Sequence, residues 1–98
     1  MEDHHHTFDL FEAIALIETA EEAQKFLLDL CTPAEIKSFI ERWRVCQLLN
    51  SKKFSYRQIN EITGASLATI GRVARFLNEE KNDGYKNMLS KLPRPDDG

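Results

Sequence analysis

Residues 56–76 form the most informative segment of the chain and read YRQINEITGASLATIGRVARF. Ser55, with Gln58 three residues later, fits a capping box that opens a short helix over 56–63. Gly64 follows this helix, and glycine enters the left-handed conformation at a helix C-terminus without a Cβ penalty. The segment therefore begins with a short helix that ends in a tight turn.

A second helix is expected directly after this turn, over about 67–80, with Ser66 as its cap. Helix, glycine turn and helix together predict a helix-turn-helix over about 56–78. Helical spacing directs these residues toward the core: Ile59, Ile62, Thr63, Ile70, Val73 and Leu77. Ala65 fits the tight corner between the two helices. The outer face of the second helix is left to Ser66, Leu67, Ala68, Thr69, Gly71, Arg72 and Arg75.

This outer face consists mostly of small side chains, so a DNA duplex could approach it closely. Leu67, Ala68 and the methyl group of Thr69 can contact a thymine methyl group, and Arg57 can offer two donors to a guanine edge. Asn60 and Thr69 can form hydrogen bonds with a base edge or a phosphate. The first turn of the second helix is therefore a candidate for reading bases in the major groove.

Cations around this face suit the DNA backbone. Lys52, Lys53 and Arg75 are expected to contact phosphates, and the free helix N-terminus at Ser66 can bind one as well. Two other interpretations stay open, because a pair of helices around a glycine turn can also serve only packing, or can bind a protein.

The distribution of charge favours DNA over these alternatives. The net charge of the chain is -3, but residues 1–35 carry -8, residues 36–78 carry +6 and residues 79–98 carry -1. A basic segment inside an acidic protein is typical of nucleic-acid binding, although it could also be a solvated face that binds nothing.

The rest of the chain also shows helical spacing and helix-capping patterns. Helices are expected over about 8–18, 20–31, 33–49 and 84–92, and nothing in the sequence indicates a strand. Capping boxes at Thr19–Glu22 and Thr32–Glu35 open the second and third of them, and Asp83 can cap the last. The third should turn Ile36, Phe39, Ile40, Trp43, Cys46 and Leu49 inward.

Length and composition indicate a single all-α domain over residues 8–92, with disordered ends at 1–7 and 93–98. No segment approaches the roughly 18 apolar residues of a membrane span, and a reduced, cytoplasmic setting is expected. Cys31 and Cys46 lack metal-site or disulfide spacing, and His4–His6 is more typical of a disordered end than of a metal site. We expect no catalytic residue, no cofactor and no metal.

Several motifs resemble the Trp-repressor superfamily. These are Leu30–Glu35 (LCTPAE), Arg42–Val45 (RWRV), Ser55–Ile59 (SYRQI) and, above all, Thr63–Val73 (TGASLATIGRV). The last of these motifs is closer to the YerC/YecD branch than to the tryptophan-responsive repressor. The resemblance covers about residues 30–90 and implies a six-helix fold in which two chains form an intertwined homodimer. It also implies DNA contacts from Arg57, Asn60, Leu67, Ala68, Thr69 and Gly71.

The resemblance raises the question of an effector. Thr32, Arg42 and Arg72 match three residues that line the ligand pocket of the tryptophan-responsive repressor. Val73 and Phe76, however, stand where that repressor has glycine and a small hydroxyl residue, and the extra volume should crowd an indole ring. We therefore expect no tryptophan-like effector. Arg42 and Arg72 would then contact phosphates or pair with nearby glutamates.

These observations predict a homodimeric, sequence-specific transcriptional regulator, most simply a repressor, that binds duplex DNA through its helix-turn-helix. The alternative is a helix-turn-helix module that docks on the transcription machinery. No nucleophile–base pair, carboxylate dyad or metal cage suggests an enzyme.

Overall fold

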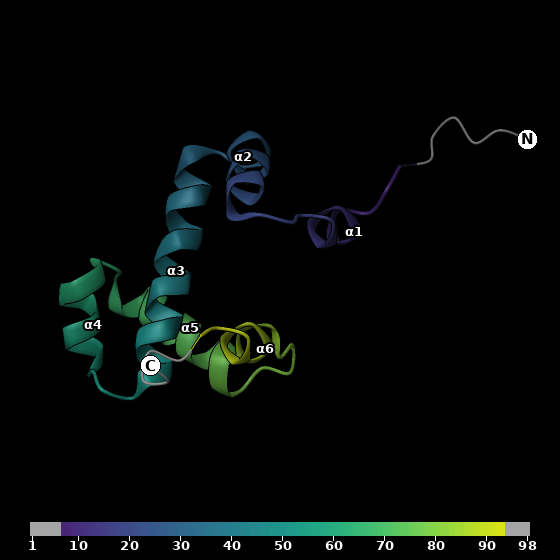
Figure 1. The fold of residues 1–98 in the computed structure, drawn as a ribbon. Coiled ribbons are helices and arrows are strands. Elements are labelled where there is room, and N and C mark those ends of the chain that lie inside the picture. Colours follow the sequence, from purple (N-terminus) through teal and green to yellow (C-terminus); the bar gives the residue numbers. More distant parts are fainter. Residues whose placement is uncertain (1–6, 94–98) are drawn as a thin grey trace, which may run out of the picture. The chain divides into compact units, whose positions relative to one another are not determined.

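The computed structural model of the protein describes residues 7–93, which form helices and connecting loops without any strand. Figure 1 shows the six helices, α1 (Leu10–Ala15), α2 (Ala20–Leu30), α3 (Pro33–Ser51), α4 (Tyr56–Thr63), α5 (Leu67–Asn78) and α6 (Gly84–Ser90). This confirms the all-helical, six-helix prediction. Residues 1–6 and 94–98 of the two predicted disordered ends, His4–His6 among them, lie outside the described residues.

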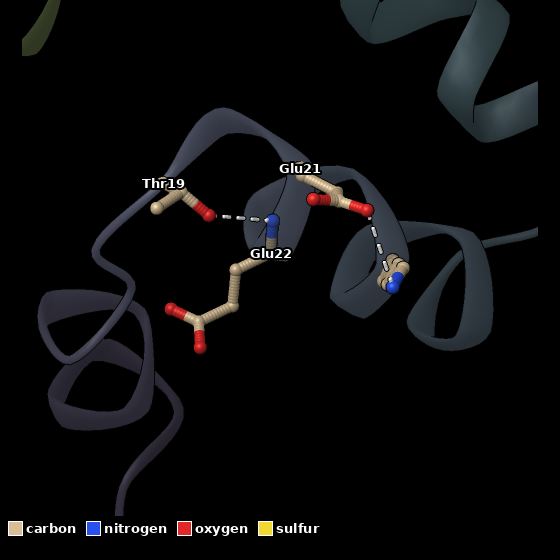
Figure 2. Close-up of polar contacts among 4 residues, drawn as sticks. Thr19, Glu21 and Glu22 are labelled. Carbon is tan, nitrogen blue, oxygen red and sulfur yellow. Dashed lines mark hydrogen bonds and ion pairs between the residues drawn. The ribbon is translucent and has the colours of Figure 1, made fainter.

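Capping residues fix where the first helices begin. α1 begins after Asp9, whose carboxylate accepts from the backbone N–H of Glu12 while the Glu12 carboxylate accepts from that of Asp9. The sequence analysis missed this capping box and predicted that the helix begins near Phe8. At α2, the Thr19 hydroxyl accepts from the Glu22 backbone N–H at 3.0 Å, as Figure 2 shows. The first half of the predicted Thr19 capping box is therefore present.

The Glu22 carboxylate completes this cap in a modified form. It accepts from the backbone N–H of Glu18 at 2.7 Å, one residue before the expected partner. Figure 2 also shows the carboxylate of Glu21, which pairs with the Lys25 ammonium group at 3.4 Å. Both side chains of this pair are largely exposed, so it adds little to stability.

Contacts between residues divide the chain into two compact units, 1–36 and 37–98. In the first unit, none of the described residues of α1 and α2 is buried. The start of α3 has the predicted capping box, because the Glu35 N–H donates to the Thr32 hydroxyl at 3.1 Å and the Thr32 N–H donates to the Glu35 carboxylate at 2.8 Å.

The second unit contains the hydrophobic core. α4, α5 and α6 pack with the C-terminal half of α3, and the buried cluster consists of Val45, Cys46, Ile59, Ala65, Ile70, Val73 and Leu77. The side chains of Trp43, Leu48, Leu49, Phe54, Tyr85 and Leu89 pack against it. The core therefore holds α5 on one side only and leaves its other side outside the packing.

Three residues expected in the core are exposed. Ile62 is 45% exposed, because the eight-residue helix α4 buries a narrow stripe at Ile59. Phe39 and Ile40 are 45% and 57% exposed. α3 is about 28 Å long at 1.5 Å per residue, and the shorter helices packed around its C-terminal half do not cover these two residues.

The start of α6 also differs from the prediction. Asp83 precedes the helix, but its backbone is left-handed with φ of 60°, and its side chain forms no capping hydrogen bond. The left-handed backbone turns the carboxylate away from the geometry in which an extended N-cap residue accepts from the first turn.

Hydrogen bonds fix the turn between α4 and α5. Gly64 adopts φ of 78° and its N–H donates to the Asn60 carbonyl at 2.8 Å. The side-chain amide of Asn60 donates to the Ala65 carbonyl at 2.7 Å, and the Ala65 N–H donates to the Thr63 hydroxyl at 3.0 Å. The turn is thus held by backbone and side chains together, which sets the direction in which α5 leaves it.

Candidate nucleic-acid interface

The first turn of α5 is exposed and carries small side chains. Ser66 caps the helix by accepting from the Thr69 N–H at 3.1 Å. Ser66, Leu67 and Ala68 are exposed, and Thr69 is half-buried. The opposite side of α5 is buried through Ile70, Val73, Ala74 and Leu77. The structure therefore brings the predicted base-reading residues to one outer surface of the helix-turn-helix.

Gly71 extends this surface by one helical turn. A Cβ atom built at Gly71 would meet nothing within 4 Å, so packing inside the chain does not require glycine there. Glycine in the middle of a helix costs roughly 1 kcal/mol relative to alanine. The helix therefore carries a glycine that neither its own stability nor packing inside the chain favours.

Exposed cations lie on both helices of the pair and in the loop before them. Arg57 is exposed in the first turn of α4, and Lys52 and Lys53 are exposed in the loop before it. Arg72 and Arg75 are exposed farther along α5. Together with Ser66, Leu67, Ala68, Thr69, Gly71 and the half-buried Asn60, these residues form what we call the α4–α5 surface.

Asn60 differs from the other members of this surface. Its side-chain nitrogen already donates to the Ala65 carbonyl, so it holds the turn. A contact of Asn60 with DNA would therefore have to come from its side-chain oxygen or from a rearranged amide.

Arg72 and Arg75 both contact the ring of Phe76. The guanidinium carbon lies 4.4 Å from the ring centroid for Arg72 and 5.1 Å for Arg75. Arg75 also pairs with the Glu80 carboxylate at 3.8 Å. The sequence analysis treated Phe76 only as bulk in a ligand pocket and missed these contacts. The four-residue spacing places Arg72 and Phe76 on the same side of a helix, whereas neighbours such as Arg75 and Phe76 are not expected to face each other.

A cavity of about 640 Å³ opens beside these residues. It is lined by Trp43, Arg72, Phe76, Asn82, Gly84, Tyr85, Met88 and Leu92. The rings of Trp43 and Tyr85 stack with centroids 6.4 Å apart and planes inclined by 23°. The volume is in the range of small-molecule sites.

The three residues considered for a ligand pocket have different surroundings. Arg72 lines the cavity, and Arg42 is half-buried on α3. Thr32 belongs to the first unit, where it caps α3. Burial raises the pKa of the Tyr85 phenol, as does the neighbouring Cys46, while the positive charges of Arg42 and Arg72 act in the opposite direction. Both arginines therefore act on the aromatic wall of the cavity.

Cys46 is the buried cysteine of the second unit. Burial raises the pKa of the Cys46 thiol to about 11, so this group is neutral and a poor nucleophile near pH 7. Within residues 7–93 no group of three or more His, Cys, Asp or Glu side chains could hold a metal ion. In the same range, no helix is long and apolar enough to cross a membrane.

Comparisons with known proteins identify the family. The family model described as Trp repressor protein matches residues 6–93. YerC of Bacillus subtilis (strain 168) is 41% identical over 83 residues, which cover 85% of this chain and 78% of that protein. A Trp operon repressor homolog of Aliivibrio salmonicida (strain LFI1238) is 33% identical over 78 residues, which cover 76% and 72%.

A solved structure agrees with these sequence relatives. The crystal structure of a TrpR-like protein from Eubacterium eligens ATCC 27750 matches with a TM-score of 0.76 and 42% identity, and the match covers 87% of this chain and 89% of that one. The similarity to YerC confirms the branch that the motif at Thr63–Val73 indicated. The chain therefore belongs to the Trp repressor family, a family of DNA-binding regulators rather than of enzymes.

Proposed function

We propose that this protein is a sequence-specific transcriptional repressor that binds duplex DNA as a homodimer through α4 and α5. The observation that carries the proposal is the α4–α5 surface, which combines a capped, exposed helix start with small side chains and exposed arginines and lysines on α4, on α5 and in the loop before α4. Small side chains let α5 enter a major groove, and the surrounding cations match the phosphates on both sides of it.

Roles within this surface follow from chemistry. Arg57 offers two parallel donors to a guanine edge, while Ala68 and Leu67 offer apolar contacts to a thymine methyl group. Lys52 and Lys53 are long, exposed cations in a loop, so they bind phosphates without reading sequence. Affinity would come largely from these phosphate contacts and fall steeply with salt.

A homodimer is supported by the apolar side chains that the protomer leaves uncovered. Phe11 and Leu16 of the first unit are mostly exposed, and Phe39 and Ile40 of α3 are about half exposed. Large apolar side chains in such number indicate an interface between chains. A symmetric dimer would present α5 twice, so its operator would have two similar half-sites.

The proposed repressor acts without tryptophan. The Phe76 ring forms part of the cavity wall beside Arg72, and Val73, which is buried in the middle of α5, stands where the tryptophan-responsive repressor has glycine. Calorimetric titration with tryptophan is expected to give no saturable heat. Saturation near micromolar concentration would contradict this part of the proposal.

Selection of bound fragments from a pool of random duplex DNA tests the whole proposal. We expect enrichment of a sequence with two inverted half-sites, together with binding that weakens steeply as salt increases. Salt-sensitive binding without enrichment would leave a nonspecific DNA-binding protein, and no binding at low salt would refute the proposal.

A protein-docking module is the second candidate. It is favoured by Leu67, a large apolar residue that is 59% exposed at the start of α5, and by the acidic residues 1–35, which would repel DNA if they lay next to it. The DNA selection separates the two functions, because a docking module would enrich no duplex.

A further inference from the structure

Phe76 lies at the edge of the α4–α5 surface, one residue after Arg75 and four after Arg72. Its ring centroid lies 4.4 Å from the Arg72 guanidinium carbon and 5.1 Å from that of Arg75. Both distances are within the roughly 6 Å over which an aromatic ring attracts a cation. One half-buried ring thus contacts two exposed cations of the proposed DNA-binding surface.

We propose that Phe76 is a positioning residue for DNA binding, whose ring holds the guanidinium groups of Arg72 and Arg75 ready to bind phosphates. This role rests on the proposed function, since it concerns the partners that the two arginines have when DNA is bound. It adds a residue that contacts no DNA itself but acts through two that do.

The chemistry of the two kinds of contact makes the arrangement suitable. A guanidinium group stacks on a ring through its flat face, whereas it binds a phosphate through the N–H groups at its edge. An arginine held by an aromatic ring therefore keeps its donors available. Because the side chain is already partly ordered, less conformational entropy is lost when the phosphate binds.

The contact of Arg75 with Glu80 differs in this respect. The two groups are 3.8 Å apart and about half exposed, which makes the ion pair weak. A carboxylate also occupies the same N–H edge that a phosphate would use. DNA would therefore displace Glu80 from Arg75, while the Phe76 ring could keep its contact in the complex.

A purely structural role is the competing explanation, because Phe76 also lines the cavity beside Trp43 and Tyr85. Two substitutions separate the roles. Phe76→Leu keeps an apolar side chain of similar bulk but removes the aromatic face, and Phe76→Tyr keeps the face. Thermal unfolding of both variants reports any loss of packing.

The binding test uses a fluorescein-labelled duplex of random sequence, because phosphate contacts do not depend on sequence, and measures anisotropy over a range of salt concentrations. We expect Phe76→Leu to bind about three- to tenfold more weakly with a shallower salt dependence, and Phe76→Tyr to stay within about twofold of the unsubstituted protein. A merely structural role would lower the melting temperature and leave the salt dependence unchanged.

Unchanged affinity and salt dependence in Phe76→Leu would overturn the inference while leaving the proposed function intact. Absence of salt-sensitive binding by the unsubstituted protein would refute the proposed function instead. The contact from which the inference starts is tested separately, without DNA. In NMR spectra, the ring current of Phe76 should shift the side-chain protons of Arg72 and Arg75, and these shifts should disappear in Phe76→Leu. Random-coil shifts in the unsubstituted protein would overturn it.

Discussion

At the scale of single residues, the α4–α5 surface combines two kinds of cation that differ in what they can recognise. Arg57 projects from the first turn of α4, whereas Lys53 lies in the loop that precedes it. A guanidinium fork can form two parallel hydrogen bonds with one base edge, while an ammonium group is a compact charge that suits any phosphate.

Substitution of these two residues should therefore have different effects. We expect Arg57→Ala to reduce binding to a selected operator by roughly 1–3 kcal/mol and to relax sequence preference, because a bidentate base contact is lost. Lys53→Ala should weaken operator and random DNA alike. Titration of both variants with both duplexes provides the measurement, and equal losses on the two duplexes for both variants would contradict the assignment.

Gly71 permits a second test at this scale. Gly71→Ala should stabilise the free protein by up to about 1 kcal/mol, because alanine favours the helix and the added Cβ meets open space. The same methyl group should weaken DNA binding if the backbone of α5 approaches the duplex closely. Chemical denaturation and DNA titration of one variant check both effects. A variant that is more stable and binds DNA normally would show that Gly71 lies away from the duplex.

At the scale of helices and turns, the parts that local chemistry determines could be predicted from the sequence. The starts of α3, α4 and α5 follow from the capping residues Thr32, Ser55 and Ser66. Each of them accepts a hydrogen bond from the backbone N–H three residues later. Gly64 ends α4 in the left-handed conformation that its type allows. The position of the helix-turn-helix and its outer face therefore follow from neighbouring residues.

Features that depend on distant parts of the chain could not be predicted in the same way. Ile62 and Phe39 show helical spacing suited to burial, but whether a helix face is covered depends on which other helices reach it. The two contacts of Phe76 likewise depend on the side-chain conformations of Arg72 and Arg75, which the pattern of residue types leaves open. Which residues bind DNA is still a prediction.

Gly64 tests how strongly the turn determines the structure of the helix pair. Gly64→Ala should lower stability by roughly 1–2 kcal/mol, because a Cβ atom is unfavourable at φ of 78° even though space is open around it. Gly64→Asn should lose less, since asparagine tolerates this conformation better. Thermal unfolding of both variants is the measurement, and Gly71→Ala is the control for adding a methyl group to a helical glycine. Equal stability of Gly64→Ala and the unsubstituted protein would show that the turn relaxes.

At the scale of the whole molecule, charge and exposed apolar surface are distributed unequally along the chain. The basic charge is concentrated in residues 36–78, while the large apolar side chains with the greatest exposure belong to α1 and its flanking residues. One surface for DNA and another for a second copy of the chain would account for both. In such a dimer each copy of α5 increases the effective concentration of the other at the DNA.

Two exposed apolar residues distinguish these surfaces experimentally. Ile40 and Leu67 are 57% and 59% exposed, but Ile40 lies on α3 and Leu67 begins α5. We expect Ile40→Glu to convert the dimer to a monomer in sedimentation analysis and to weaken operator binding, since a buried charge disrupts an apolar interface. Leu67→Glu should remain a dimer and still lose DNA binding, because the new carboxylate repels phosphates. A Leu67→Glu monomer, or an Ile40→Glu dimer with normal operator affinity, would show that the two surfaces have been assigned wrongly.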